Sequence, residues 1–441
     1  MNFRSSDRKI YYLFILLFVV FTYNAFNYDL KFQQDSQNNH YPILNIMLMN
    51  FDSIKAFYGL LYYFYVSIFS IFAFPFYNFD ILSPREAFYL TIRISNTFLF
   101  ILTFFLSYNL SKKIFKSSDF YSLLPVIIIF SFSSIHRTFF MARVENIFIP
   151  LVLLIISLTY DLLKKKSLNK KNTFFLIFSI FIIGSQQING LIFIFTYFFF
   201  LLLFYKDYKN LLKFFVITLF LICCYYILHY YIVGSSVVKL PYEMDSKIGK
   251  IGLFNLGQSF NIFYNFSFSN SWENPLRYAQ SNSMLNTFFL DLFGDYYGYG
   301  HFNYKKNDGA MTKDLVVCLA NINRVSLILS IIFFLFFIIS IIFYIFKINL
   351  KNTKDKIFLF QILSFLSGIF VIVAITIRLY EPNHTLFKWE YINYCLIGSS
   401  FIITNYIIYL KKNNNILNKI QLFLFFLLII LSYNQILPSR C

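Results

Sequence analysis

The chain has 441 residues, of which 58% are hydrophobic, 23% aromatic and only 13% charged, and its mean hydropathy is +0.62. The apolar residues come in runs near the length that crosses a bilayer, which excludes a set of ordinary soluble domains and predicts an all-α polytopic membrane protein. The five cysteines are odd in number and show no metal-ligand spacing, so they predict no disulfide framework.

Hydropathy along the chain predicts eleven transmembrane helices. Basic residues precede the first, and no small-residue cleavage site follows it, so we interpret it as a span rather than a cleaved signal. Hydropathy does not decide whether an additional apolar stretch at 56–76 crosses the membrane. The predicted spans are residues 10–26, 90–110, 120–135, 146–162, 173–187, 189–205, 212–233, 326–346, 357–377, 391–410 and 420–437.

The lysine-rich connections decide the topology, because basic loops favour the cytoplasmic side. If 56–76 does not cross, every basic cluster falls on one side; if it does cross, those from Lys112 onward lie opposite the N-terminus. The first arrangement puts 21 Lys/Arg and 5 Asp/Glu inside, giving +16, and leaves +2 outside, which recovers the total of +18. We therefore expect 56–76 to lie in the outer leaflet, and read the basic charge as a topology signal rather than a nucleic-acid footprint.

This topology divides the chain into an N-terminal transmembrane module (1–233) with a first external loop (27–89), a roughly 90-residue external loop region (234–325), and C-terminal transmembrane helices (326–441). Shorter external segments are expected at 136–145 and 378–390. Fifteen of the 20 acidic residues fall on this external side. Any chemistry is therefore expected at the periplasmic or extracellular face of the cell membrane, with the N-terminus in the cytoplasm.

The first external loop carries two carboxylates and a histidine close to the membrane: Asp29, Asp35 and His40. A carboxylate at a membrane surface can act as general base toward an acceptor hydroxyl. The alternative is that Asp29 and Asp35 are ordinary solvated loop charges.

Arg143 and Glu145 lie at the predicted outer mouth of a span, where a charge near hydrocarbon must pair or extend toward water. Because residues two apart do not share a helix face, we expect these two to reach different partners. The alternative is a pair of anchors at a helix end. Arg93, a few residues inside the second span, is expected to snorkel or to pair with an external carboxylate.

The segment 378–390 places Arg378, Lys388 and Glu390 between two spans. Two cations at the interface could bind a phosphate; alternatively, Lys388 snorkels beside an aromatic belt. Two further stretches carry weaker signals. Polar residues at a hairpin tip could face a cavity or hydrate a turn, and aromatic and acidic residues of the long loop could bind sugars or be there by chance: Gln186, Gln187, Asn189, Trp272, Asp291, Asp295, Tyr296, Tyr297 and Tyr299.

The order of four stretches, "QQDSQNNHYP", "YGLLYYFYVSIF", "YLTIRISNTFLF" and "MARVENIF", resembles the GT-C superfamily of polytopic glycosyltransferases. The bacterial lipid A aminoarabinose transferases and the protein O-mannosyltransferases are the most similar in pattern. The resemblance covers residues 10–235 and, loosely, 378–400. It implies juxtamembrane helices in the first external loop, lying along the leaflet without crossing. In those families Asp is more usual at the position of Glu145.

The resemblance implies transfer of a sugar from a polyprenyl-phosphate-linked donor to a glycan, lipid or protein acceptor, with inversion. It assigns Asp35, or else Asp29, as base and Glu145 as a carboxylate that orients the acceptor or contacts a divalent cation, whose use stays open. Arg378 and Lys388, supported by Arg143, become candidates for the phosphate. Two other classes remain open: an O-antigen polymerase or ligase type of protein, and a transporter.

Overall fold

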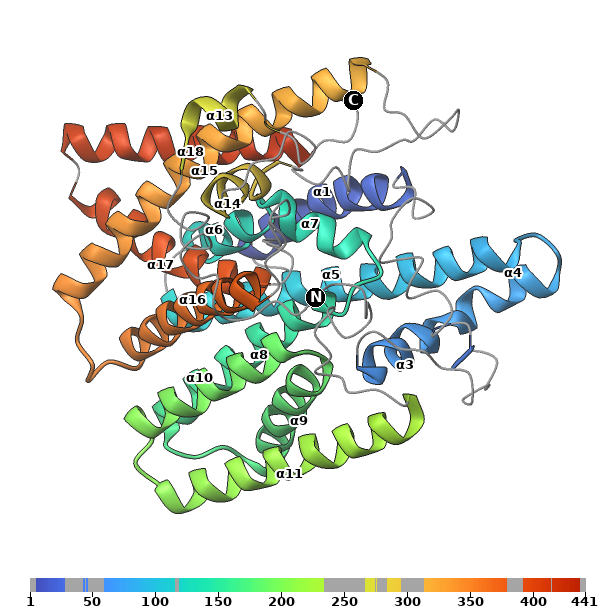
Figure 1. Ribbon diagram of the computed structural model, residues 1–441. Helices are drawn as coiled ribbons and strands as arrows, with labels where there is room; N and C mark the ends of the chain where they lie inside the picture. The colour runs from blue at the N-terminus through green and yellow to red at the C-terminus, as the bar shows by residue number, and fades with distance from the viewer. Residues whose placement is uncertain are drawn as a thin grey trace.

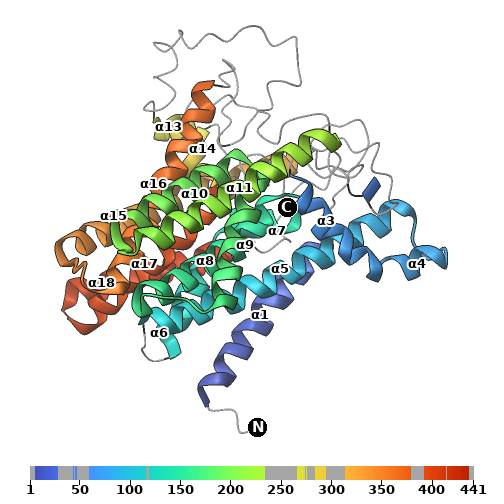
Figure 2. The ribbon, with the colours of Figure 1, turned by 90° about the horizontal axis from the view of Figure 1, so that it is seen from below.

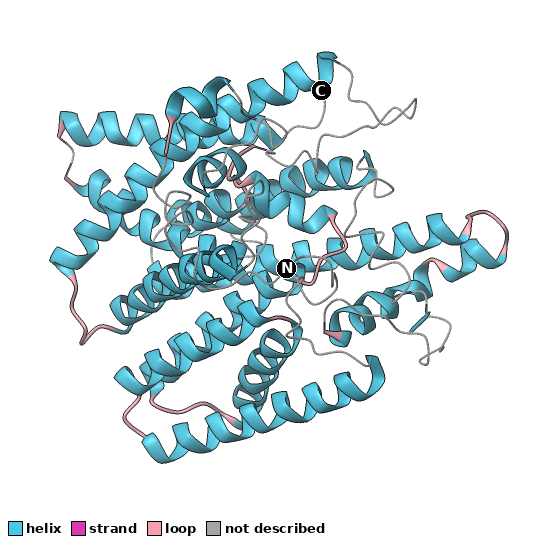
Figure 3. Ribbon diagram, viewed as in Figure 1, coloured by secondary structure: helices cyan, strands magenta, loops and turns pink. Residues whose placement is uncertain are grey.

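The computed structural model describes residues 5–27, 43, 45–46, 59–115, 119–233, 266–273, 275, 284–294, 313–378, 392–413 and 415–436. These residues form helices and connecting turns, with no strand among them (Figure 3). The helices are α1 (Ser5–Asn27), α3 (Leu60–Ile68), η3 (Phe69–Phe72), α4 (Phe74–Asn78), α5 (Pro84–Phe115), α6 (Asp119–Ile129), α7 (Ser133–Phe140), α8 (Glu145–Lys165), α9 (Lys170–Gln186), α10 (Ile188–Phe204), α11 (Tyr208–Val233), α13 (Phe268–Glu273), α14 (Met284–Asp291), α15 (Lys313–Lys347), α16 (Thr353–Arg378), α17 (Asn393–Lys412) and α18 (Ile416–Ile436).

Seven of the described helices are long and apolar enough to cross a membrane, namely α1, α5, α8, α11, α15, α17 and α18. The bent pair α6–α7 makes an eighth candidate. The chain is therefore an α-helical multi-pass membrane protein. The predicted count of eleven would need α9, α10 and α16 as well, and it remains a prediction.

Burial separates central from peripheral helices. In α8 and α17, 78% and 83% of the apolar window is buried, against 22% in α11 and 28% in α1 and α18. Figure 1 shows α11 and α18 at two outer edges of the bundle with α8 and α17 between them. The exposed faces of the peripheral helices carry Leu, Ile and Phe, as surfaces in contact with lipid do.

The basic connections gather at one end of this bundle, which we call the lysine end. Lys113 forms an ion pair of 2.8 Å with Asp161. The amino groups of four other lysines lie over aromatic rings from different helices, 4.9 to 5.5 Å from the ring centroids: Lys354 over Phe115, Lys356 over Phe204, Lys347 over Tyr409 and Lys411 over Tyr121. These contacts bring the lysine-bearing ends of α5, α15, α16 and α17 together. That all the basic clusters lie on one side of the membrane remains a prediction. The compartment that this end faces remains a prediction.

The pairing of α1 with α5 bears on the stretch 56–76. The ring of Phe14 lies 5.1 Å from that of Phe104, while Phe26 near the end of α1 lies beneath Arg93, 5.4 Å from its guanidinium carbon. The two helices are therefore antiparallel, and the chain leaves α1 and enters α5 at the same end, opposite the lysines. Residues 60–78 form the short helices α3, η3 and α4 packed against α5, so the chain between α1 and α5 makes no net crossing of the bundle.

Helices α5 and α8 instead run parallel, because Asn96 contacts Asn146 and Lys113 contacts Asp161. The chain must therefore return across the bundle between them, over about 25 Å at 1.5 Å per residue. It does so through α6 and α7, which are bent by 63° at a break. Residues 133–150 are all buried, so the segment 136–145 is packed inside the protein and is not an exposed connection. The prediction that it lies on the external side remains a prediction.

The cysteines differ in state. Cys318, in the first turns of α15 and far from Lys347 at the lysine end, is disulfide-bonded, whereas Cys223, Cys224 and Cys395 are free. The expectation from the odd cysteine count therefore fails at Cys318.

Candidate functional site

The break between α6 and α7 and the linker from α7 to α8 place irregular backbone inside the bundle, where each polar group needs a partner. The linker carbonyl of Met141 accepts hydrogen bonds from the side-chain amides of Asn96 and Asn146, at 2.9 and 2.8 Å. His136 Nε2 lies 2.8 Å from the carbonyl oxygen of Phe130. These contacts hold the linker in place immediately before α8.

The linker positions Arg143, and α8 begins at Glu145. Both side chains are buried, at 0% and 2% exposure. Arg143 Nε lies 3.5 Å from Glu145 Oε2. The expectation that the two reach different partners is therefore wrong: Arg143 precedes the helix, so the rule for residues on a helix face does not apply to it. Glu145 also sits in the first turn of α8, where the helix dipole favours a negative charge.

The turn between α9 and α10 supplies a third polar group to this site. Gln187 Nε2 donates to Glu145 Oε1 at 3.2 Å, and Asn189 Nδ2 lies 3.4 Å from Gln187 Oε1. The hairpin tip that the sequence indicated only weakly is therefore part of the site. Because the donor is an uncharged amide, it fixes the carboxylate's orientation without neutralising its charge.

Helix α3 closes the site from the side of the first loop. The backbone N–H of Tyr62 donates to Gln186 Oε1 at 3.0 Å, and Gly59 N–H donates to the Gln186 carbonyl at 3.1 Å. A Cβ at Gly59 would collide with the carbonyl oxygen of Ser185, so this close approach requires glycine. The residues that end the first loop are thus fixed to the α9–α10 turn beside Glu145.

Tyr62 also brings a hydroxyl to the site. The hydroxyl is buried and has no hydrogen-bond partner among the residues that the structure describes. Burial raises the pKa of Tyr62 well above its usual value, as do Tyr63, Tyr65 and Glu145, whereas Arg143 lowers it. The phenol therefore stays protonated and can donate. A buried donor that meets no acceptor among the described residues can serve another acceptor, such as a ligand oxygen or water.

The other predicted site residues are only partly described. Arg378 is the last residue of α16, which projects beyond its neighbours toward α13 and α14 (Figure 2), and its side chain lies outside the described part. The remaining candidates lie wholly outside the described residues: Asp29, Asp35, His40, Lys388 and Glu390. No group of three or more His, Cys, Asp and Glu that could hold a metal occurs among the described residues, where Glu145 alone offers a carboxylate to this site.

Arg93 and two residues of the long loop have contacts that bear on their predicted roles. The guanidinium of Arg93 lies over the ring of Phe26. Trp272 stacks on Phe268 and lies under Arg324. Asp291 is buried and pairs with Arg137 at 2.9 Å, so its expected role in binding sugar hydroxyls is not supported.

The chain was compared with protein-family models, with curated proteins and with solved structures, and none matches it.

Proposed function

We propose that the chain is a membrane glycosyltransferase that moves a sugar from a polyprenyl-phosphate-linked donor to an acceptor at the end of the bundle opposite the lysines. The observation that carries the proposal is the Glu145 site. A buried carboxylate lies 3.5 Å from Arg143 and accepts a hydrogen bond from Gln187. Tyr62, whose hydroxyl is buried, is bonded through its backbone N–H to the adjacent Gln186. Such a grouping of charge and directed donors is typical of a site that binds hydroxyls or phosphate.

The path of the chain supports a role for the first loop. Its first part follows the end of α1, where Phe26 contacts Arg93, and leads to Gly59, which is bonded to Gln186. Both ends of the stretch that carries Asp29, Asp35 and His40 are thus fixed near the Glu145 site. A loop carboxylate, Asp35 or else Asp29, is our candidate base.

In this mechanism the base takes the proton of the acceptor hydroxyl as its oxygen attacks the anomeric carbon. The bond from that carbon to the phosphate oxygen breaks, and the polyprenyl phosphate leaves with the electron pair. Arg378 and Lys388, with Arg143, stabilise the phosphate charge, while Glu145 and Glu390 orient hydroxyls. A divalent cation, if used, would need loop carboxylates beside Glu145, because hard cations take several oxygen ligands.

Cysteine chemistry supports the orientation. Cys318 is disulfide-bonded and lies toward the end of α15 that is far from Lys347. Structural disulfides are typical of oxidising compartments outside the cytoplasm. Lysine-rich connections favour the cytoplasm. The disulfide at one end of the bundle and the lysines at the other end therefore indicate the same orientation. We propose eleven spans, with the Glu145 site facing outward.

Glu145→Gln keeps the shape of the side chain and removes its charge. We expect sugar transfer in proteoliposomes supplied with a polyprenyl-phosphate sugar to fall at least ~100-fold, the usual scale for a positioned acid or base. Glu273→Gln is the matched control, because Glu273 is an exposed carboxylate at the end of α13. The double variant R143Q/E145Q separates chemistry from folding: it removes both charges, so stability should recover relative to E145Q while transfer stays low.

Asp35→Asn tests the base, and we expect it to abolish transfer without changing membrane insertion. Asp29→Asn is its matched partner in the same loop, and loss in Asp29→Asn alone would move the assignment there. Full transfer in both the D29N/D35N double variant and Glu145→Gln would refute the glycosyltransferase proposal.

Two rival classes predict other outcomes. An O-antigen polymerase or ligase would depend on Arg378 and the later loops and would tolerate D29N/D35N. One observation favours a transporter: the α6–α7 pair is broken and carries buried His136 and Arg137. Broken helices often line transport sites. Solute flux that D29N/D35N leaves unchanged, in proteoliposomes without sugar transfer, would favour it.

A further inference from the structure

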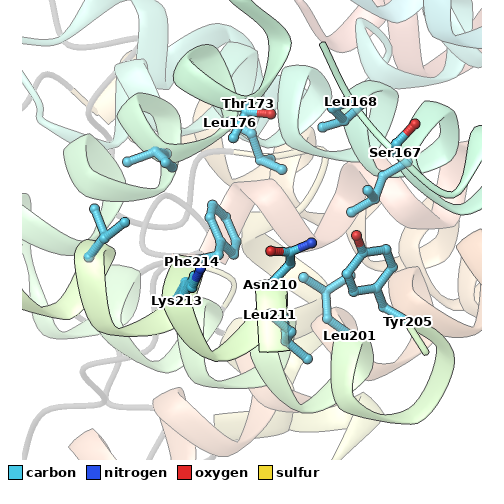
Figure 4. Close-up of a pocket in the computed structure, with 13 residues that line it drawn as sticks. Ser167, Leu168, Thr173, Leu176, Leu201, Tyr205, Asn210, Leu211, Lys213 and Phe214 are labelled. Carbon is cyan, nitrogen blue, oxygen red and sulfur yellow. The ribbon is translucent and has the colours of Figure 1, made fainter. Parts of the chain in front are cut away.

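A cavity of about 330 Å³ lies at the lysine end, far from the Glu145 site, between the ends of α8, α9, α10 and α11 (Figure 4). Its volume is at the lower end of the ~300–1,000 Å³ usual for small-molecule sites. Its polar side chains come from α9, α11 and the connections that follow α8 and α10: Ser167, Thr173, Tyr205, Asn210 and Lys213.

The rest of the lining is apolar. Leu176, Leu201 and Leu211 are buried, and Phe214 is half-buried. Ile217 lies one turn further along α11 and is 48% exposed, on the face of that helix that carries exposed Val216 and Phe220. Because α11 is the most exposed of the candidate spans, the apolar side of the cavity is continuous with a surface that meets lipid.

The charge around the cavity is strongly positive. Residues 161–213 contain eight lysines and two aspartates, and no arginine or glutamate. Both aspartates are engaged: Asp161 pairs with Lys113, and Asp207 accepts hydrogen bonds from the backbone N–H and the side-chain amide of Asn210, at 3.1 and 2.5 Å, at the start of α11. Lys213 lines the cavity and makes no ion pair or hydrogen bond in the part of the chain that the structure describes.

We infer that this cavity binds the headgroup of an anionic phospholipid from the leaflet at the lysine end. Lys213 supplies the positive charge for the phosphate, and the Ser167 and Tyr205 hydroxyls supply hydrogen bonds. The acyl chains lie along the exposed face of α11. A basic, partly apolar pocket between helices at the membrane surface is the general form of such sites. The inference does not depend on the proposed sugar transfer.

The test uses the full-length protein in detergent with phosphatidylglycerol added, followed by thermal unfolding and by native mass spectrometry of retained lipid. Lys213→Gln is compared with Lys209→Gln, which removes the same charge from an exposed residue outside the cavity lining. We expect phosphatidylglycerol to raise the wild-type Tm saturably. Lys213→Gln should weaken binding about fivefold, corresponding to ~1 kcal/mol per lysine near a surface, and Lys209→Gln less than twofold.

Ser167→Trp places a bulky side chain in the lining of the cavity without changing charge, and we expect it to abolish retention of the lipid. Three results would overturn the inference. Equal effects of the two lysine variants would indicate non-specific attraction. An equal Tm shift with phosphatidylcholine would remove the selectivity for anionic lipid. The same shift with inorganic phosphate alone would indicate a site for free phosphate rather than for a lipid.

Discussion

Two buried arginines that lie six residues apart in the chain, Arg137 and Arg143, each pair with a carboxylate, and the two pairs differ in the distance between their charged groups. Arg137 Nη2 contacts Asp291 Oδ1 at 2.9 Å and the Asp291 carbonyl at 3.0 Å, and its Nη1 contacts the Gly294 carbonyl and Ser133 Oγ. Arg143 Nε stands 3.5 Å from Glu145 Oε2, longer than a good N–H···O hydrogen bond.

The difference separates a structural contact from a candidate site. The first pair fixes α14 against α7, since Ser133 Oγ also donates to the Gly294 carbonyl at 2.8 Å. The guanidinium of Arg137 is directed at four acceptors within the protein. The second pair has a longer contact, a neighbouring amide, and a buried hydroxyl, that of Tyr62, which meets no acceptor among the residues that the structure describes. A short, directly bonded charge pair stabilises a fold, whereas a pair with a longer contact can rearrange around a substrate.

The largest effect is expected at the first pair. Asp291→Asn leaves Arg137 buried without its counter-charge, which typically costs ~3–5 kcal/mol. We expect poor yield and a strongly lowered Tm in detergent. Glu273→Gln, which changes an exposed carboxylate, should leave Tm unchanged. An Asp291→Asn variant with normal Tm and no sugar transfer would reverse the comparison and make this pair the functional one.

A smaller effect is expected at the second pair. Gln187→Leu removes the amide that donates to Glu145, and hydrogen bonds to charged groups contribute ~1.5–3 kcal/mol. We expect transfer to fall about tenfold, with a much smaller loss of Tm than in Asp291→Asn. Gln421→Leu is the control, since Gln421 accepts from Tyr406 in the C-terminal helices. A fall in Tm as large as that of Asp291→Asn would show that this pair is structural too.

The smallest effect is expected at the lysine end, where charge is only partly buried. Burial lowers the pKa of Lys354 to about 8, against the attraction of Asp355 and with help from Lys412. In the unfolded chain the pKa of this lysine is near 10.5. Between pH 8 and pH 10.5 the unfolded state therefore binds more protons than the folded state, and the contribution of Lys354 to the free energy of unfolding rises with pH.

Lys354→Met removes that penalty. We expect a stabilisation of about 0.5 kcal/mol, the scale of partly exposed sites, at pH 7. It should shrink as the pH approaches 10. Tm series of wild type and variant across this range measure it; Lys351→Met, at an exposed residue of the same connection, should show no such trend. A difference independent of pH would show that Lys354 does not titrate in this range.

Hydropathy alone located most helices. The predicted spans 189–205 and 146–162 correspond closely to α10 (Ile188–Phe204) and α8 (Glu145–Lys165). Composition decides such helices because each needs a long apolar run. The break at residues 130–132 was not predicted, because it contains no Gly or Pro. It depends on tertiary contacts, such as the bond from Ser134 N–H to the Leu292 carbonyl.

The candidate site was only partly predictable for a related reason. Glu145 and Arg143 were identified by their position at a helix mouth, but their mutual contact was not, because it depends on where α8 begins. Gln187 gave a weak signal, and Tyr62 gave none among 35 tyrosines. Both reach Glu145 or its neighbours through contacts between residues far apart in sequence, which a local pattern does not contain.

The contacts of α7 also constrain the order of assembly. Arg137 and Ser133 bond to residues 291–294, which the ribosome makes more than 150 residues later. At ~5–20 residues per second, the first half waits roughly 8–30 s for these partners. During that interval the buried arginine has no counter-charge in the lipid. The N-terminal helices therefore cannot complete their packing as an independent unit, and chains truncated before residue 291 should be recognised by quality-control proteases rather than accumulate as a stable fragment.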